Sequence, residues 1–225
     1  MARLLIHVEG QTEETFVNEV LAPHLYSYGL LSVGARLLGG RGGIRGWDAA
    51  RRDILKHLRQ DRECFNTTMV DYYALPQTRA RAWPGRHGAG SLAFERKAGA
   101  VEQALLDDIA QEMGDGFDRR RFIPFVTMHE FEGLLFSDCE RFGNAIGRPE
   151  LFGPFQAIRD QFATPEEIND SPFTAPSKRV KNLAPNYEKP LFGALAALAI
   201  GLDAICAECP HFRAWVRALE GLVSQ

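Results

Sequence analysis

Short apolar runs alternate with amphipathic stretches over the first 130 residues of the chain. The runs that predict strands lie at residues 4–8, 30–38, 64–73 and 121–128. The stretches with apolar positions every three to four residues, which predict helices, lie at residues 11–29, 47–61 and 94–113. A regular alternation of strand and helix predicts an α/β fold with a mostly parallel central sheet flanked by helices.

The second half of the chain has helical spacing almost throughout. Its longest apolar run, "PLFGALAALAIGL" at residues 190–202, is too short to cross a bilayer and predicts a buried helix. We therefore expect an α/β core over residues 1–145 and a helical C-terminal extension over residues 146–225. The extension would pack on the core as part of one compact domain, and no membrane association is predicted.

Two segments lack either period. Residues 39–47, "GGRGGIRGW", and residues 74–94, which contain glycine, proline and arginine, are predicted to be irregular loops. Long loops without secondary structure are uncommon in compact domains and are often functional. We therefore expect these two segments to lie near a site.

The net charge, the N-terminal segment and the cysteines limit the classes of protein to which the chain can belong. The net charge of −3 does not by itself indicate a nucleic-acid-binding protein. Arg3 and Glu9 interrupt the first apolar run, so it does not read as a signal peptide. The four cysteines contain only one CxxC pair, Cys206 and Cys209, and are interpreted as reduced, which predicts a cytoplasmic protein.

Acidic residues stand at the ends of three predicted strands. Glu9 follows the first strand and Glu13 comes four residues later, Asp71 ends another, and Glu130 and Glu132 follow the last. In an open parallel sheet, ligands bind beyond the carboxyl ends of the strands. We therefore expect these acids to gather at one edge of the sheet.

Clustered carboxylates repel one another, and a divalent cation relieves that repulsion. Mg²⁺ or Mn²⁺ takes oxygen ligands and supports phosphodiester cleavage by polarising the phosphate and activating water. The predicted metal ligands are Glu9, Glu13, Asp71, Glu130 and Glu132, and the predicted catalytic residues are Glu9, Asp71 and Glu130. The sequence thus predicts a metal-dependent nuclease or a related phosphodiester-cleaving enzyme.

Each acid also has a simpler interpretation. Glu9 could interact with the N-terminus of the following helix, Glu13 could be an ordinary solvated acid in the first turn of that helix, and Asp71 could cap a turn. Glu130 and Glu132 could be ordinary first-turn acids on different helix faces. His129, which precedes them, could be a general acid, a ligand, a phosphate contact or a hydrogen-bonded structural histidine.

Basic residues gather where acids are absent. No acid occurs between Glu19 and Asp48 or between Asp71 and Glu95. The predicted nucleic-acid-binding residues there are Arg41, Arg45, Arg79, Arg81 and Arg86, with Trp83 among them as an aromatic for base stacking. Two solvated, flexible loops are the alternative. Further along, Lys178, Arg179, Lys181 and Lys189 would contact phosphate or form a polar helix face.

At this point the sequence resembles a known family. "VEGQTEETF" is similar to the first Toprim motif of topoisomerases, primases and overcoming-lysogenization-defect (OLD) nucleases. More closely, "VEGQTEETFV", "TTMVDYYALP" and "FIPFVTMHEFEGLLFSD" together resemble a bacterial Toprim-like family long labelled a domain of unknown function. "APSKR", "YEKPLFG" and "CPHFRAWVRAL" fit the same family, so the resemblance covers nearly the whole chain.

The resemblance implies a Toprim-like fold, a Mg²⁺-dependent nucleic-acid site and an ABC-type ATPase partner encoded nearby in bacterial mobile or defence loci. Glu9 matches the Toprim glutamate, Glu13 the second acid of OLD-type nucleases, and Asp71 the first aspartate of the Asp-x-Asp motif. Tyr73 stands where the second aspartate is expected, and a tyrosine does not hold Mg²⁺ as a carboxylate does.

That departure supports a second hypothesis, a catalytically weak or inactive Toprim-like module that docks on an ATPase partner. The apolar helices of the C-terminal half would then extend the core or form an interface, including one with a second copy of the chain. The sequence does not distinguish DNA from RNA as the nucleic acid.

Overall fold

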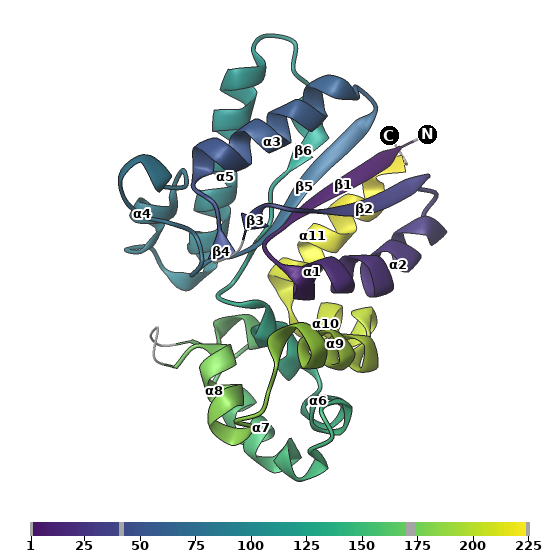
Figure 1. The fold of residues 1–225 in the computed structure, drawn as a ribbon, viewed down its shortest axis with the longest axis vertical. Helices are drawn as coiled ribbons and strands as arrows, with labels where there is room; N and C mark the ends of the chain where they lie inside the picture. Colours follow the sequence, from purple (N-terminus) through teal and green to yellow (C-terminus); the bar gives the residue numbers. More distant parts are fainter. Residues whose placement is uncertain (1, 41–42, 170–173, 224–225) are drawn as a thin grey trace.

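A five-stranded parallel sheet lies at the centre of the computed structural model, which describes residues 2–40, 43–169 and 174–223 (Figure 1). Its order is β2-β1-β5-β6, and β7 also pairs with β5. The strands are β1 (Arg3–Val8), β2 (Ser32–Leu37), β5 (Cys64–Asp71), β6 (Phe122–Ile123) and β7 (Val126–Thr127). The predicted α/β fold with a mostly parallel sheet is confirmed.

The last predicted strand, residues 121–128, is two short strands instead of one. Pro124 lies between β6 and β7, and proline has no N–H to donate to the neighbouring strand. Both pieces remain parallel to β5. The chain therefore still reaches the carboxyl edge of the sheet where the prediction placed it.

Helices cover both faces of the sheet (Figure 1). On one face, α3 (Trp47–Gln60) and α5 (Phe94–Met113) contribute to one buried apolar cluster. On the other, α1 (Gln11–Phe16), α2 (Ala22–Ser27) and α11 (Pro210–Glu220) contribute to a second. In β1, Leu4, Ile6 and Val8 lie on one face and belong to this second cluster. His7 on the opposite face is also buried, so β1 is covered on both faces.

The helical second half lies beyond the carboxyl ends of the strands, and α11 then returns to the sheet (Figure 1). Trp215 of α11 stacks on Phe125 at 4.4 Å and donates from Nε1 to Thr67 Oγ1 of β5 at 2.9 Å. The other α-helices described in this second half are α6 (Cys139–Ala145), α7 (Phe152–Arg159), α8 (Pro176–Leu183), α9 (Ala194–Ile200) and α10 (Leu202–Glu208). Residues on both sides of position 145 share one apolar core, and the division there stays a prediction.

Short helical turns join these elements. A π-helical segment, Val17–Leu21, links α1 to α2, and another, Lys189–Gly193, leads into α9. The 3-10 segments are Arg79–Arg81, Arg119–Arg121, Phe131–Ser137, Pro149–Leu151, Pro165–Glu167 and Gly221–Val223. The two segments predicted to be irregular also contain regular structure. They hold the antiparallel pair β3 (Gly39–Gly40) and β4 (Gly43–Ile44), and helix α4 (Arg86–Ala89).

The structure bears on two further predictions. All four cysteines are unpaired. In the described part of the chain, no single helix has the length and apolar character to cross a membrane. The bent pair Lys189–Ile200 and Leu202–Glu208, which meet at 85°, passes that test together, by length and composition only.

Candidate active site

The carboxyl ends of β1 and β5 bring Glu9 and Asp71 together. The two strands are parallel neighbours, with Val8 opposite Met69, so both chains leave the sheet at the same edge. The backbone N–H of Asp71 donates to Glu9 Oε2 at 3.4 Å. The predicted approach of these two acids is therefore present, and it follows directly from parallel pairing.

Glu13 joins the pair from the first turn of α1. Its carboxylate is buried, and Oε2 accepts from the Gly10 backbone N–H at 3.0 Å. A Cβ at Gly10 would lie 3.3 Å from that oxygen, so a larger residue would crowd the Glu13 carboxylate. The "EGQTE" spacing thus fixes the second acid one helical turn beyond the first.

The chain after β7 supplies the other two acids, in different surroundings. The backbone N–H of Phe131 donates to Asp71 Oδ1 at 3.0 Å, which ties this segment to β5. Glu130 Oε2 accepts from the N–H of Ser177, in the first turn of α8, at 2.9 Å. Glu132 is buried, and its Oε2 lies 2.8 Å from Nζ of Lys189.

Lys189 is the site residue that sequence reasoning missed, since it was assigned to phosphate contact or a polar helix face. Burial lowers the pKa of the Lys189 ammonium, but the nearby carboxylates of Glu132, Asp71 and Glu130 outweigh this and raise it overall. Lys189 therefore carries a positive charge inside the acidic cluster. Its only sequence signal is its position immediately before the apolar run at residues 190–202. The prediction of a buried helix over that run is only partly right, because Leu191, Leu195 and Leu198 are exposed.

Burial and mutual repulsion shift the acids in one direction. Burial, followed by the Glu13 charge, raises the pKa of Glu9 to about 7. Burial, followed by the charges of Glu9 and Glu13, raises the pKa of Asp71 well above its ordinary value. Burial also raises the pKa values of Glu13 and Glu132. The cluster is therefore short of positive charge at neutral pH despite Lys189.

The side chains do not enclose a preformed metal site. Within residues 2–40, 43–169 and 174–223, no three histidine, cysteine, aspartate or glutamate side chains are placed to hold one metal ion. Glu13, Asp71 and Glu130 accept backbone N–H bonds, and Glu132 faces Lys189. Carboxylate oxygens are ligands that hard divalent cations take, and the metal site stays a prediction.

Tyr73 and His129 form a stacked pair beside the cluster. Their ring centroids are 5.1 Å apart at an interplanar angle of 21°. Burial, together with the charges of Lys97 and Arg86, lowers the pKa of His129 to about 4. The imidazole is therefore neutral at physiological pH, which does not suit the general-acid role suggested from the sequence. The ring is stacked and its buried Nδ1 has no hydrogen-bond partner among the described residues, so the observed packing is structural but differs from the hydrogen-bonded histidine expected as the alternative.

The predicted nucleic-acid-binding arginines have different environments. Arg81 is exposed, and Arg45 is half exposed with Asp53 3.6 Å away. Arg86 is buried, donates from Nε to Tyr72 O at 2.7 Å and lies 3.7 Å from the centre of the Tyr72 ring. The prediction that Arg86 contacts phosphate directly is therefore wrong, because its guanidinium is buried and bonds to the backbone of the turn after β5.

The other aromatic and basic residues predicted to bind nucleic acid also differ in their exposure. Trp83 is buried against Trp47 at 4.9 Å, so it belongs to the core and is not available for base stacking. Lys178 is exposed on α8, whereas Arg179 donates from Nε to Thr174 O at 2.8 Å. Arg41 lies outside the described residues, as does the side chain of Arg79.

A polar cavity of about 430 Å³ opens beside Glu9. It lies between the β3–β4 pair and the chain that follows β5, the two segments predicted from the sequence to lie near a site. Its lining residues are Glu9, Gly43, Ile44, Ala74, Pro76, Gln77, Thr78 and Arg81. A substrate in this cavity would contact an acid of the cluster and an exposed arginine at once.

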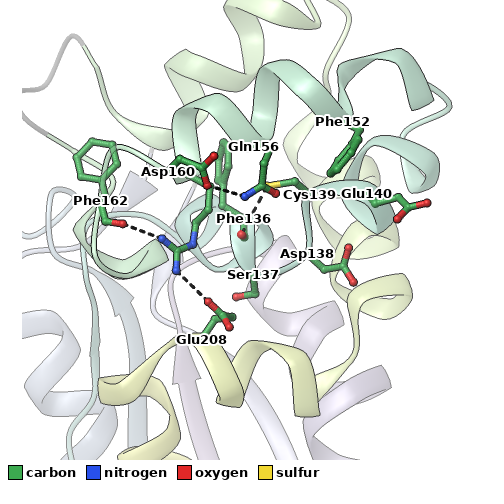
Figure 2. A pocket seen from close by; sticks show the side chains of 11 residues that line it. Phe136, Ser137, Asp138, Cys139, Glu140, Phe152, Gln156, Asp160, Phe162 and Glu208 are labelled. Atoms are coloured by element: carbon green, nitrogen blue, oxygen red, sulfur yellow. Dashed lines mark hydrogen bonds and ion pairs between the residues drawn. The ribbon is translucent and has the colours of Figure 1, made fainter.

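A larger cavity of about 550 Å³ lies among helices of the second half (Figure 2). Three of its acids have partners of their own, and two of them are joined in Figure 2: Asp160 accepts from Gln156, and Glu208 accepts from Arg159. Asp138 caps α6 through a bond from the Arg141 N–H. None of the predicted site residues that the structure describes lines this cavity, so it is not the stronger candidate for catalysis.

Comparison with known proteins places the chain in a family. The family model DUF4276, described as a domain of unknown function, matches residues 8–220. No curated protein matches the sequence. Two solved structures are similar, both of the C-terminal region of the OLD protein of Xanthomonas campestris pv. campestris, one phased with iodine and one with mercury. Each covers 100% of this chain and 97% of its own, with 15% and 14% identity and TM-scores of 0.44 and 0.42.

Proposed function

The chain belongs to the DUF4276 family of domains of unknown function, and from its carboxylate cluster we propose that it is a metal-dependent enzyme that cleaves phosphodiester bonds in nucleic acid. The observation that carries the proposal is the meeting of Glu9, Glu13 and Asp71 at the carboxyl ends of two parallel strands, beside an open polar cavity. The Toprim-like pattern in the sequence matches these same three residues.

The donor set suits Mg²⁺ or Mn²⁺ because it consists of carboxylates whose mutual repulsion a divalent cation would relieve. Glu9, Glu13 and Asp71 would hold the cation, with Glu130 beside them. When bound, such a cation polarises phosphoryl oxygens and lowers the pKa of water. Glu132 is less available, because its carboxylate faces Lys189.

The protein's own residues would carry the proton and offset the charge. In hydrolysis, a water oxygen bonds to phosphorus and the bond from phosphorus to a sugar oxygen breaks. One proton moves from the attacking water to a base, and the leaving oxygen takes a proton from solvent water. Glu9 suits the base, because it is the acid of the cluster that lines the open cavity. Lys189 keeps a positive charge where a phosphate would approach.

The test is cleavage of plasmid DNA, single-stranded DNA and single-stranded RNA in Mg²⁺ or Mn²⁺, with and without EDTA. We expect wild type to cleave only with the metal and Glu9→Gln to be slower by about 100-fold, the low end for loss of a general base. Glu14→Gln is the matched control, because Glu14 lies on the same helix and outside the cluster. Equal cleavage by wild type and Glu9→Gln would overturn the proposal.

A non-catalytic module that docks on an ATPase partner is the second candidate. Two observations favour it. A tyrosine occupies the position of the second Toprim aspartate. Three leucines are exposed, Leu191 in the segment before α9 and Leu195 and Leu198 in α9 itself. This candidate predicts no cleavage of any substrate in the same assay by the chain alone.

A further inference from the structure

The cavity beside Glu9 combines three kinds of surface. Glu9 supplies a carboxylate, Arg81 and Thr78 supply a guanidinium and a hydroxyl, and Ile44 and Pro76 supply apolar surface. Its volume of about 430 Å³ lies within the range of about 300–1,000 Å³ typical of small-molecule sites. A ligand that fills it therefore has an anionic part and a flat or apolar part within a small volume.

Arg81 has a defined place in this cavity. Its Nη2 donates to Ile44 O at 3.2 Å, which holds the guanidinium between β4 and the chain after β5. The side chain is otherwise exposed, and guanidinium carries five N–H donors in a planar fork. The donors not used by Ile44 can pair with a phosphate, which guanidinium binds with two parallel hydrogen bonds.

We propose that this cavity holds one unpaired nucleotide next to the scissile phosphate, so that the substrate is single-stranded or frayed nucleic acid and not intact duplex. The proposal rests on the proposed function, because Glu9 belongs to both. A nucleotide supplies the required parts: its phosphate faces Arg81 and Thr78, and its base lies on Ala74 and Pro76, at the edge of the buried Ile44. A nucleotide that remains stacked and paired in a duplex cannot enter a cavity of this size, so the duplex has to release it first.

Binding of fluorescein-labelled oligonucleotides tests the cavity without requiring cleavage. We would measure anisotropy with a 12-nucleotide single strand and with the same sequence as a blunt duplex, in Ca²⁺ and separately in EDTA. We expect wild type to bind the single strand at least tenfold more tightly than the duplex. Thr78→Phe, which fills the cavity, and Arg81→Gln, which removes the charge, should each weaken single-strand binding by about tenfold.

Arg62→Gln is the matched control, because it removes the same charge from an exposed position next to the opposite end of β5. Thermal unfolding of each variant separates a filled cavity from a misfolded protein. Equal affinity for single strand and duplex overturns the proposal, as does unchanged binding by folded Thr78→Phe. If no oligonucleotide binds in Ca²⁺ and none binds in EDTA, the proposal is overturned as well.

Cleavage in Mn²⁺ distinguishes this proposal from the proposed function. If wild type cleaves duplex and single strand at equal rates and Thr78→Phe does the same, the nucleotide cavity is wrong and the enzyme assignment stands. If no substrate is cleaved but the single strand binds through Thr78 and Arg81, the enzyme assignment is wrong and the cavity stands. Preferential cleavage of the single strand, lost in Thr78→Phe, supports both.

Discussion

The carboxylate of Glu9 is the group on which the proposed chemistry depends. Its carboxylate is held at the end of β1 by the Asp71 N–H, while burial and the Glu13 charge raise its pKa to about 7. An acid with a purely structural role at a strand end would be more stable without other carboxylates beside it. Glu9, Glu13 and Asp71 instead disfavour one another's ionisation, which is a cost that a bound cation would remove.

This cost predicts how stability depends on pH in the metal-free protein. Between pH 4.5 and about 7, folded Glu9 keeps a proton that the unfolded chain has lost, so the free energy of unfolding falls as pH rises. At about 1.4 kcal/mol per pKa unit, Glu9 accounts for up to about 3 kcal/mol of that fall. Glu13 and Asp71, whose pKa values are also raised, act in the same direction.

Denaturant unfolding at pH 5 and pH 8 in EDTA measures the effect. Glu9→Gln should lose less stability than wild type between the two pH values, because glutamine does not ionise. Glu14→Gln should follow wild type. Identical dependence of stability on pH for wild type and Glu9→Gln would show that the pKa of Glu9 is not raised in the folded protein.

Lys189 provides a second test at the same scale. Replacing it in Lys189→Met leaves Glu132 buried opposite no positive charge. We expect the free energy of unfolding at pH 8 to fall by about 2 kcal/mol, below the full penalty for breaking a buried pair because the ammonium is partly exposed. The double variant Lys189→Met, Glu132→Gln should recover most of the loss. A double variant no more stable than the single one would exclude a direct pair.

At the scale of elements, strands and their acidic ends could be predicted from the sequence, whereas long-range supports could not. The apolar runs before Glu9 and Asp71 predict parallel strands, and parallel pairing brings the two acids together. Nothing local to Lys189 indicates that its segment packs against α1 and faces Glu132. Burial of Arg86 and Trp83 was also missed, because an arginine or tryptophan in an irregular segment has the same local pattern in a core as in a loop.

The contact between α1 and the segment before α9 decides where Lys189 lies. Gly193 makes it possible, since a Cβ there would lie 2.9 Å from Thr12 Cγ2 and 3.2 Å from Tyr187 Oη. Gly193→Ala should therefore cost about 1–3 kcal/mol by overpacking. Gly153→Ala in α7, where a Cβ meets no atom within 4 Å, should be neutral or stabilising. Equal stability of both variants, measured by thermal unfolding, would contradict this close packing.

At the scale of the whole molecule, the helical second half completes the α/β core. Residues of α9, α10 and α11 share an apolar cluster with Leu4 and Ile6 of β1, and α11 bonds to β5 through Trp215. The same half supplies Ser177 to Glu130 and Lys189 to Glu132. Sheet edge and helical half therefore jointly form the carboxylate cluster, and a cation bound there would stabilise the entire fold by mass action.

The most direct test of that central claim is a calorimetric titration of the full chain with Mn²⁺ at pH 8, above the pKa of Glu9. We expect wild type to bind Mn²⁺, Asp71→Asn to bind it at least tenfold more weakly, and Asp115→Asn, which changes an exposed acid, to match wild type. No binding by wild type, or equal binding by wild type and Asp71→Asn, would contradict the assignment of this cluster as a metal-dependent site.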